Sequence, residues 1–220
     1  MLDVSVILLT TDPTKQMVQS TMKAIMETTP KPFELIINHV SSSEFGFSNG
    51  VNRMVRGARG ENLILINDDC VPPPGWVEKL TAAAREPGVG IVGGLPDGAS
   101  EDFVTFGLVL IRREVFKSIG GLNERYKLGH EDSDFCLRAV RAGFKVKCVD
   151  VGAAHLKGTS SRSMRATALH VRSTVTYGVD HGYPPQKIVA KALWTLSYNA
   201  RYAAKTFPLA VALRRLKHQL

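Results

Sequence analysis

The stretch Asn62-Leu63-Ile64-Leu65-Ile66-Asn67-Asp68-Asp69 is an uninterrupted apolar run that stops at two adjacent carboxylates. A run of this length and composition is typical of a strand buried on both faces of an α/β sheet. Ligands bind beyond the carboxyl ends of such strands. Because adjacent carboxylates repel each other, we expect a divalent cation such as Mg²⁺ or Mn²⁺, shared with substrate phosphates. The alternative is a solvated surface turn.

The rest of the first 155 residues alternates short apolar runs with amphipathic segments. This alternation predicts an α/β fold with a mostly parallel central sheet flanked by helices. Segments 97–103 and 157–166 are polar and are predicted as loops. The predicted strands are Val4–Leu9, Leu35–Ile37, 62–66, Val89–Val92, Phe106–Ile111 and Lys145–Val151, and the predicted helices cover 14–27, 48–58, 75–85 and 131–142.

The net charge of +8 on 220 residues is unevenly distributed. Residues 1–155 hold 17 Lys and Arg against 19 Asp and Glu, whereas residues 156–220 hold 11 against Asp180 alone. The basic surplus therefore belongs to the tail, and the body is not predicted to bind nucleic acid. Three widely spaced cysteines without a CxxC pattern favour a reducing compartment. The opening segment lacks the basic residues of a signal peptide, and no apolar run is long enough to span a membrane.

The tail is predicted to contain a basic amphipathic helix over residues 186–206. Its basic side chains lie mostly off the apolar stripe. Such a helix can pack against the body, lie on an anionic membrane surface, or join two copies of the chain. The spacing of Trp194, Tyr198 and Tyr202 fits a helix face better than a base-stacking platform. The stripe consists of Val189, Leu193, Leu196, Ala200, Ala203 and Phe207.

A second acidic motif, Glu131-Asp132-Ser133-Asp134, follows Gly129-His130 at a predicted helix start. The helix dipole favours negative charge there, which is a sufficient structural explanation by itself. The same field would keep Asp132 ionised, as a general base requires. His155, directly after the last predicted strand, is a competent ligand beside a carboxylate for Mn²⁺, although a lone histidine is more often structural.

These signals occur in the order found in one known family. The chain resembles the family 2 glycosyltransferases of the GT-A (Rossmann-like) fold, the bacterial rhamnosyltransferase-like branch especially. The resemblance covers residues 4–160, and its ordered series is more specific than any single element. The matching elements are Val4–Ile7, Pro32–Ile37, Gly46-Phe47…Asn52, Asn67-Asp68-Asp69 with Val71-Pro72-Pro73-Pro74-Gly75-Trp76, Gly120-Gly121-Leu122-Asn123-Glu124, Glu131-Asp132 and His155-Leu156-Lys157-Gly158.

The resemblance implies a metal-dependent glycosyltransferase that inverts the anomeric centre. It assigns the divalent cation, Mn²⁺ or Mg²⁺, to Asp69 and His155, and the general base to Asp132. The expected donor-binding residues are Thr10, Asn38, Asn52 and Asp68. The expected acceptor-binding residues are Glu131 and Trp76. The donor would be a UDP- or dTDP-linked sugar, and the acceptor a hydroxyl of a glycan or lipid-linked glycan.

The sequence departs from the family pattern on the nucleotide-base side. An acidic DDGS-like turn usually follows the second strand, but Asn38-His39-Val40-Ser41-Ser42-Ser43 contains no aspartate. The family's short third strand is also expected to be missing, because Ser43-Glu44-Phe45-Gly46 follows the turn at once. The departures favour an alternative in which a degenerate domain binds glycan or a protein partner without catalysis. A nucleotidyltransferase is disfavoured because the early loop Thr10–Lys15 contains no glycine.

The predicted organisation is a catalytic domain over residues 1–160 and a basic helical extension over residues 161–220. Anionic lipid attracts Lys and Arg, and enzymes of this kind commonly use lipid-linked acceptors. We therefore expect a cytoplasmic protein attached peripherally to the inner membrane face, with homo-oligomerisation through the tail as the second interpretation. Nucleic acid is not an expected partner.

Overall fold

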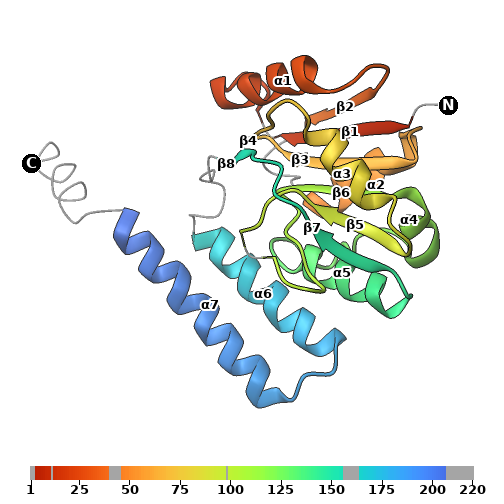
Figure 1. Cartoon of the computed structure of the whole chain (residues 1–220). Helices are drawn as coiled ribbons and strands as arrows, with labels where there is room; N and C mark the ends of the chain where they lie inside the picture. Colours follow the sequence, from red (N-terminus) through yellow and green to blue (C-terminus); the bar gives the residue numbers. More distant parts are fainter. Residues whose placement is uncertain (1–2, 11, 40–45, 98, 156–163, 207–220) are drawn as a thin grey trace, which may run out of the picture. The chain divides into compact units, whose positions relative to one another are not determined.

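In the computed structural model, residues 3–10, 12–39, 46–97, 99–155 and 164–206 are described. Strands and helices alternate along most of the chain (Figure 1). The strands are β1 (Val4–Thr10), β2 (Glu34–His39), β3 (Asn62–Asn67), β4 (Cys70–Val71), β5 (Val89–Gly93), β6 (Leu108–Arg112), β7 (Lys145–Cys148) and β8 (Ala154–His155). The helices are α1 (Gln16–Thr28), α2 (Phe47–Gly57), α3 (Trp76–Ala84), α4 (Arg113–Ile119), α5 (Glu131–Arg141), α6 (Met164–Asp180) and α7 (Pro185–Thr206).

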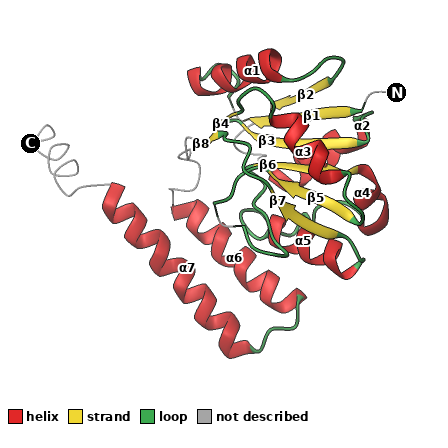
Figure 2. Ribbon diagram, in the orientation of Figure 1, coloured by secondary structure: helices red, strands yellow, loops and turns green. Residues whose placement is uncertain are grey.

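The chain divides into two compact units, and the first contains the sheet. It comprises residues 1–124 and 131–157, and the second comprises residues 125–130 and 158–220. The main sheet has six strands in the order β2-β1-β3-β6-β5-β7 (Figure 2). Strands β1, β2 and β3 are parallel, β5 and β7 are parallel, and β6 runs antiparallel to β3 and β5. The predicted α/β fold with a mostly parallel sheet is confirmed.

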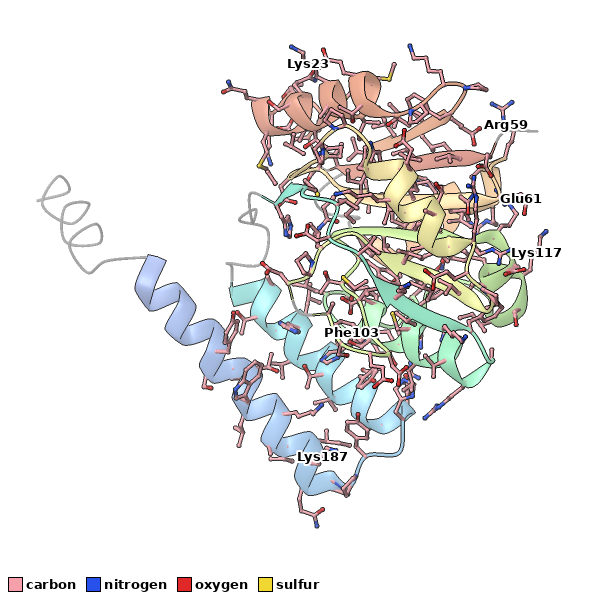
Figure 3. All side chains as sticks on the ribbon, viewed as in Figure 1. Lys23, Arg59, Glu61, Phe103, Lys117 and Lys187 are labelled. Atoms are coloured by element: carbon pink, nitrogen blue, oxygen red, sulfur yellow. The ribbon has the colours of Figure 1, made fainter. Side chains whose placement is uncertain are left out.

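Helices cover both faces of the sheet because its strands are apolar on both sides. All seven residues of β1 are buried. Val6 and Leu8 pack with α1 and α3, while Ile7 and Leu9 face the opposite core with α2, α4 and α5. Alternate residues of a strand point to opposite faces, which accounts for this division. Figure 3 shows side chains filling the space on both sides of the sheet.

Several predicted segments differ from the structure in extent. The strand predicted from Phe106 begins at Leu108, and the one predicted to end at Val151 ends at Cys148. Helix α4 and the short pair β4–β8 were not predicted, because segments of seven and two residues show too little periodicity. The predicted loop 157–166 lies mostly outside the described residues, and its last residues, 164–166, form the start of α6.

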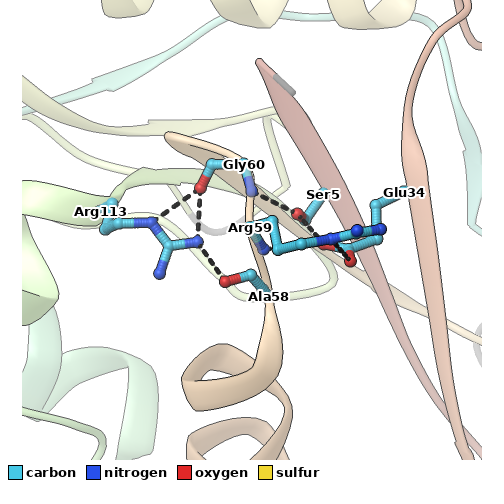
Figure 4. A network of polar contacts seen from close by, with 6 residues as sticks. All are labelled: Ser5, Glu34, Ala58, Arg59, Gly60 and Arg113. Carbon is cyan, nitrogen blue, oxygen red and sulfur yellow. Dashed lines mark hydrogen bonds and ion pairs between the residues drawn. The ribbon is translucent and has the colours of Figure 1, made fainter. Parts of the chain in front are cut away.

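A polar network ties together the amino-terminal ends of the parallel strands (Figure 4). The Arg113 guanidinium donates to the carbonyls of Ala58 and Gly60, at 2.8 Å for both Nη2–Ala58 and Nε–Gly60. The Gly60 amide donates to Ser5 Oγ at 2.9 Å, and that hydroxyl donates to Glu34. This network joins α4 to β1 and β2 at the edge opposite the strands' carboxyl ends, which stay available for a site.

The second unit contains an α6–α7 pair, packed closely at Gly178. A Cβ on Gly178 would lie 2.6 Å from Ile188 Cγ1, so only glycine allows this approach. Thr195 is buried on the same side of α7, whereas Val189, Leu193 and Leu196 of the predicted stripe are 57%, 60% and 45% exposed. Ala200, Ala203 and Phe207 lie outside the residues whose side chains are described. Within the described ranges, no helix is long and apolar enough to cross a membrane.

Basic side chains at the start of α7 lie over an aromatic ring of the same unit. Lys187, labelled in Figure 3, has its Nζ 4.5 Å from the centre of the Tyr183 ring. Lys191 Nζ lies 5.1 Å from the same ring. These are cation–π contacts, so the lysine stems pack on the unit while their charges stay near solvent.

Candidate active site

The carboxyl ends of β1, β2 and β3 lie at one edge of the sheet. Because the three strands are parallel, Leu9 of β1 is in register with Asn38 of β2 and with Asn67 of β3. Asp68 and Asp69 follow β3 directly, so they lie at this edge. The position agrees with the crevice where α/β proteins bind ligands. The side chain of Asn38 lies outside the described part of the chain.

Asp68 is held from two neighbouring elements. Thr10 Oγ1 donates to Asp68 Oδ2 at 2.6 Å, and Thr21 Oγ1 of α1 donates to the Asp68 carbonyl at 3.1 Å. Thr10 is 1% exposed, and its hydroxyl supports the Asp68 carboxylate. Its predicted contact with the donor stays a prediction.

Asp69 lies beside His155 because of the short β4–β8 pairing. Cys70 of β4 is in register with His155 of β8. This pairing places His155 Nε2 3.3 Å from Asp69 Oδ1. Asp69 is 7% exposed, which puts the carboxylate largely out of solvent. The sequence prediction that these two distant residues share one site is consistent with this contact, and their metal-binding role stays a prediction.

The pair fits a divalent cation that also binds substrate. One carboxylate oxygen and one imidazole nitrogen are suitable ligands for Mn²⁺. Within the described ranges, no group of three His, Cys, Asp or Glu side chains could hold a metal ion. Magnesium-type sites often use one or two carboxylates, with waters and substrate phosphates supplying the other ligands. A two-residue set therefore suits a cation held jointly with a diphosphate.

Asp132 lies in the first turn of α5, on the same edge of the sheet. Its Oδ1 accepts a hydrogen bond from the Ser133 amide at 2.7 Å. Burial raises the pKa of the Asp132 carboxyl, although hydrogen bonds from the backbone amides of Ser133 and Phe106 act in the opposite direction. Residue Gly107, next to Phe106, accepts from the Asn67 amide at 2.8 Å. Asp132 is thus tied to the chain that runs beside the end of β3.

Gly107 also connects this region to His155. A Cβ on Gly107 would lie 3.5 Å from His155 Cε1, 3.8 Å from Asn67 Nδ2 and 2.9 Å from Leu95 Cδ1. Only a residue without a side chain fits comfortably among these three groups. The Asp69–His155 pair and Asp132 therefore approach the 106–107 segment from different elements.

An ion pair within α5, between Asp134 and Arg138, holds the loop that precedes the helix. Asp134 is 2% exposed, and its Oδ2 contacts Arg138 Nε at 2.8 Å. The same guanidinium donates to the carbonyls of Ile119 and Gly121 at 2.9 and 3.0 Å. The helix dipole alone accounts for Asp134 in the sequence, and its pairing with Arg138 was not predicted. The acid–base spacing of four residues was the signal that could have found this pair.

Asn52 holds the Gly121–Glu124 loop to α2. Its Nδ2 donates to the Leu122 carbonyl at 2.9 Å, and its Oδ1 accepts from the Leu122 amide at 2.8 Å. The amide also donates to Glu124 Oε1 at 3.0 Å, while Asn49 donates to Glu124 Oε2 at 3.0 Å. The Asn52 amide thus supports this loop, and its predicted contact with the donor stays a prediction.

The two predicted acceptor-binding residues differ in their surroundings. Trp76 is 0% exposed and packs in the core with α1 and the sheet. The ring is part of the hydrophobic core, and its acceptor-binding role stays a prediction. Glu131 is partly buried at the first position of α5, directly before Asp132. Its acceptor-binding role stays a prediction.

Comparison with known proteins relates this fold and site to one family. The model of glycosyl transferase family 2 matches residues 9–142. An uncharacterized protein, y4gI, from Sinorhizobium fredii is 30% identical over 46% of this chain and 16% of its own length. The O-antigen biosynthesis protein RfbC of Myxococcus xanthus is 30% identical over 54% of this chain and 12% of its own length. The chain therefore covers less than a fifth of these relatives.

Solved structures share the fold. Mannosyltransferase PcManGT from Pyrobaculum calidifontis, in complex with GDP-Man and Mn²⁺, matches with a TM-score of 0.63 and 17% identity, over 98% of this chain and 79% of that one. The catalytic domain of Drosophila β1,4-galactosyltransferase 7 in complex with xylobiose matches with a TM-score of 0.53 and 19% identity, over 72% of each chain. The rhamnosyltransferase-like branch stays a prediction. Because the family model spans β3, its two aspartates and the α5 motif, the chain belongs to glycosyl transferase family 2.

Proposed function

We propose that the protein is a metal-dependent, inverting glycosyltransferase. It transfers a sugar from a nucleoside diphosphate donor, UDP- or dTDP-linked, to a hydroxyl of a glycan or lipid-linked glycan. The observation that carries the proposal is the 3.3 Å contact between His155 and Asp69 at the sheet edge that also holds Asp132. Membership of family 2 supports transfer from a nucleotide sugar.

Asp69 and His155 are the residues that would hold the cation. A bound Mn²⁺ or Mg²⁺ would stabilise the negative charge that develops on the leaving nucleoside diphosphate. Asp68, fixed by Thr10, is assigned to the ribose or sugar side of the donor. Two structural neighbours support this view of the site. PcManGT was solved with GDP-Man and Mn²⁺, and a mutant of the Drosophila galactosyltransferase was solved with manganese, UDP-Gal and xylobiose.

Asp132 is the proposed general base. Its carboxylate accepts the proton of the acceptor hydroxyl while that oxygen attacks the anomeric carbon. The bond from the anomeric carbon to the diphosphate oxygen breaks, and the configuration at this carbon inverts. A base raised in pKa by burial is a stronger proton acceptor than an exposed aspartate, as long as the pH keeps it ionised. Glu131, the neighbouring carboxylate, is assigned to an acceptor hydroxyl.

A donor screen tests the proposal. The purified chain is incubated with UDP-, dTDP- and GDP-linked sugars, with and without Mn²⁺, and released nucleotide is measured in the presence of oligosaccharide acceptors. We expect release that requires both the cation and an acceptor. A domain that binds glycan without catalysis would release no nucleotide from any donor, and calorimetry would then detect no nucleoside diphosphate binding.

We also propose that α7 attaches the protein to an anionic membrane surface. Its apolar side chains Leu193 and Trp194 are 60% and 63% exposed, and Tyr198, 51% exposed, stacks on Trp194 with ring centres 5.2 Å apart. Trp and Tyr suit the boundary between headgroups and acyl chains. The basic surplus of residues 156–220 adds attraction to anionic lipid. A peripheral location would bring the site close to lipid-linked acceptors.

Flotation with liposomes tests the attachment. The double variant Leu193→Ser, Trp194→Ser should lose flotation with anionic vesicles, because it removes exposed apolar surface from α7. Val179→Ser is the control, since Val179 of α6 is 61% exposed but lies on the other helix. Equal flotation of both variants and the original chain would contradict the attachment through α7. Loss of a dimer in the double variant would favour self-association instead.

A further inference from the structure

Helix α6 makes a series of contacts with residues 125–130, the segment directly before Glu131-Asp132. Ser173 Oγ, fully buried at 0% exposure, accepts hydrogen bonds from the backbone amides of Lys127 and Leu128, at 3.2 and 3.4 Å. A single side chain of α6 thus satisfies two consecutive backbone donors of this segment. Such donors are costly to leave without a partner when they are buried.

The end of α6 holds the beginning of the same segment. Asp180 Oδ1 pairs with Arg125 Nη1 at 2.6 Å, and its Oδ2 accepts a hydrogen bond from the Tyr126 hydroxyl at 3.0 Å. Tyr126 is 1% exposed. Asp180 is the single acidic residue of the tail, so this carboxylate serves the 125–130 segment rather than the basic surface around it.

His130 closes the segment against α6. Its Nε2 lies 3.1 Å from Thr174 Oγ1, and its ring stacks on Tyr177 with centres 4.8 Å apart. Because the Thr174 hydroxyl donates to the His170 carbonyl, it accepts from His130. Burial, together with the nearby His170 and Lys191, lowers the pKa of His130 to about 4. The imidazole is therefore neutral at physiological pH, which suits its stacking on the Tyr177 ring.

The turn between this segment and α5 has an uncommon backbone. Gly129 and His130 both have positive φ, at 78° and 70°. A non-glycine residue rarely adopts this conformation, and it persists only where surrounding contacts determine it. At Gly129 an added Cβ would lie 2.7 Å from His170 Cδ2 and 2.8 Å from Nε2. The turn therefore approaches α6 so closely that a side chain at position 129 would meet His170.

We infer that α6 is a positioning element for the catalytic base: by holding residues 125–130, it constrains the backbone that continues directly into Glu131 and Asp132. The inference rests on the proposed role of Asp132. The first unit holds the residue before the segment, since Asn49 and Asn52 bind Glu124. Within the second unit, α6 holds the segment from Arg125 to His130. The tail then has a part in the reaction besides docking.

The substitution Gly129→Ala is the sharpest test, and the chain offers a matched control. The added methyl meets His170, so it pushes the turn away from α6. Gly182→Ala introduces the same change at a φ of 69° in the same unit, but its Cβ meets nothing within 4 Å. Both variants carry the backbone cost of a left-handed alanine. A difference between them therefore reports the contact with α6.

We expect Gly129→Ala to lower kcat by about 10- to 100-fold, because small displacements of a reacting group are costly. The KM for the donor and the calorimetric affinity for Mn²⁺ with a nucleoside diphosphate should stay as in Gly182→Ala, since Asp69 lies in the turn between β3 and β4 and His155 lies in β8. Adding His170→Ala to Gly129→Ala should restore part of kcat by opening space. Equal kcat in the two glycine variants, or a parallel loss of kcat and nucleotide affinity, would overturn the inference.

A second pair of variants, which changes the structure less, covers the case in which Gly129→Ala fails to fold. Ser173→Ala removes the acceptor of two amides without adding bulk, and Ser197→Ala removes an exposed hydroxyl of α7 that donates to the Trp194 carbonyl. We expect kcat to fall several-fold in the first variant alone, with nucleotide affinity unchanged. If Ser173→Ala and Ser197→Ala had the same kcat, the contacts between α6 and residues 125–130 would have no part in catalysis.

Hydrogen exchange gives a readout that does not depend on turnover. Amides in the peptide spanning residues 125–135 should exchange faster in Gly129→Ala and Ser173→Ala than in their controls, while β1 and β3 stay protected. Unchanged exchange in this peptide would overturn the inference even if kcat had fallen. If no donor supports turnover in the unsubstituted protein, the proposed function fails, whereas the exchange result still decides whether α6 holds the segment.

Discussion

Asp69 and Asp132 are two partly or largely buried carboxylates at one edge of the sheet, and their neighbours differ. Asp69 faces an imidazole nitrogen 3.3 Å away, a group that can share a cation with it. Asp132 is surrounded by backbone amides and apolar chain, and burial raises its pKa. A carboxylate beside a second ligand suits metal binding, whereas a buried one raised in pKa suits proton transfer. The groups around each carboxylate, more than the residue type, are the reason for proposing metal binding for Asp69 and proton transfer for Asp132.

Asp69→Asn is expected to have the largest effect on turnover. An amide oxygen carries no charge to hold a divalent cation, so the stabilisation of the leaving diphosphate would be lost. We expect kcat/KM to fall by at least about 10³-fold, since metal ions contribute several kcal/mol in such sites. Circular dichroism should show an unchanged fold. Retained metal-dependent turnover would contradict the assignment of Asp69.

Asp132→Asn should come next in size. Removing a general base costs about 10²- to 10⁴-fold in rate. The KM for the donor should change little, because the cation and diphosphate are held elsewhere. Steady-state assays with saturating Mn²⁺ measure both constants. Near-normal turnover in this variant would show that another group, or water, accepts the proton.

Thr10→Val is predicted to have a moderate effect through Asp68. It removes the hydroxyl that donates to Asp68 Oδ2 while keeping a similar shape. Loss of a supporting partner commonly costs about 10-fold or more in activity or affinity. Thr28→Val is the control, since that hydroxyl donates within α1 to the Ala24 carbonyl. If both variants raised the donor KM equally, Thr10 would have no specific part in placing Asp68.

The smallest expected effect concerns stability and its pH dependence. Burial raises the pKa of Asp132 in the folded state, so the folded state is more stable when this carboxyl is protonated and neutral. That contribution is complete below the ordinary aspartate value of 3.8 and is lost as pH rises through the folded-state pKa. Asp132→Asn should therefore raise Tm at pH 7, and the gain should shrink at low pH.

Thermal melts across pH 3–8 measure this difference between Asp132→Asn and the unsubstituted chain. For a chain of this size, about 1 kcal/mol corresponds to about 2–4 °C, so a shift of a few degrees is resolvable. A constant difference at every pH would contradict the raised pKa.

The sequence was informative where local pattern decides structure. Apolar runs such as 62–66 locate strands because their burial on both faces requires it, and the order of motifs led to Asp69, Asp132 and His155. Side-chain roles that depend on contacts with residues far away in the sequence were harder to predict. The long-range hydrogen bonds of Thr10 to Asp68 and of Asn52 to Leu122, for example, could not be predicted from local pattern.

Burial and long-range packing explain the remaining differences. Trp76 follows a proline-rich stretch that is typical of a surface loop, but the ring lies in the core at 0% exposure. Residues 125–130 show no periodicity that would link them to α6, whose hydrogen-bonding partners lie 44 to 55 positions further along, so only the structure reveals that contact. The α7 pattern predicted a helix, but not which side of it would be exposed.

Binding of nucleoside diphosphate tests the division of roles most directly. Calorimetric titrations with UDP, dTDP and GDP, each with and without Mn²⁺, compare the unsubstituted chain with Asp69→Asn and Asp132→Asn. We predict Mn²⁺-dependent binding in the unsubstituted chain and in Asp132→Asn, and its loss in Asp69→Asn. Equal binding by both variants, or its loss from both, would contradict the account of one carboxylate for the metal and the other for the proton.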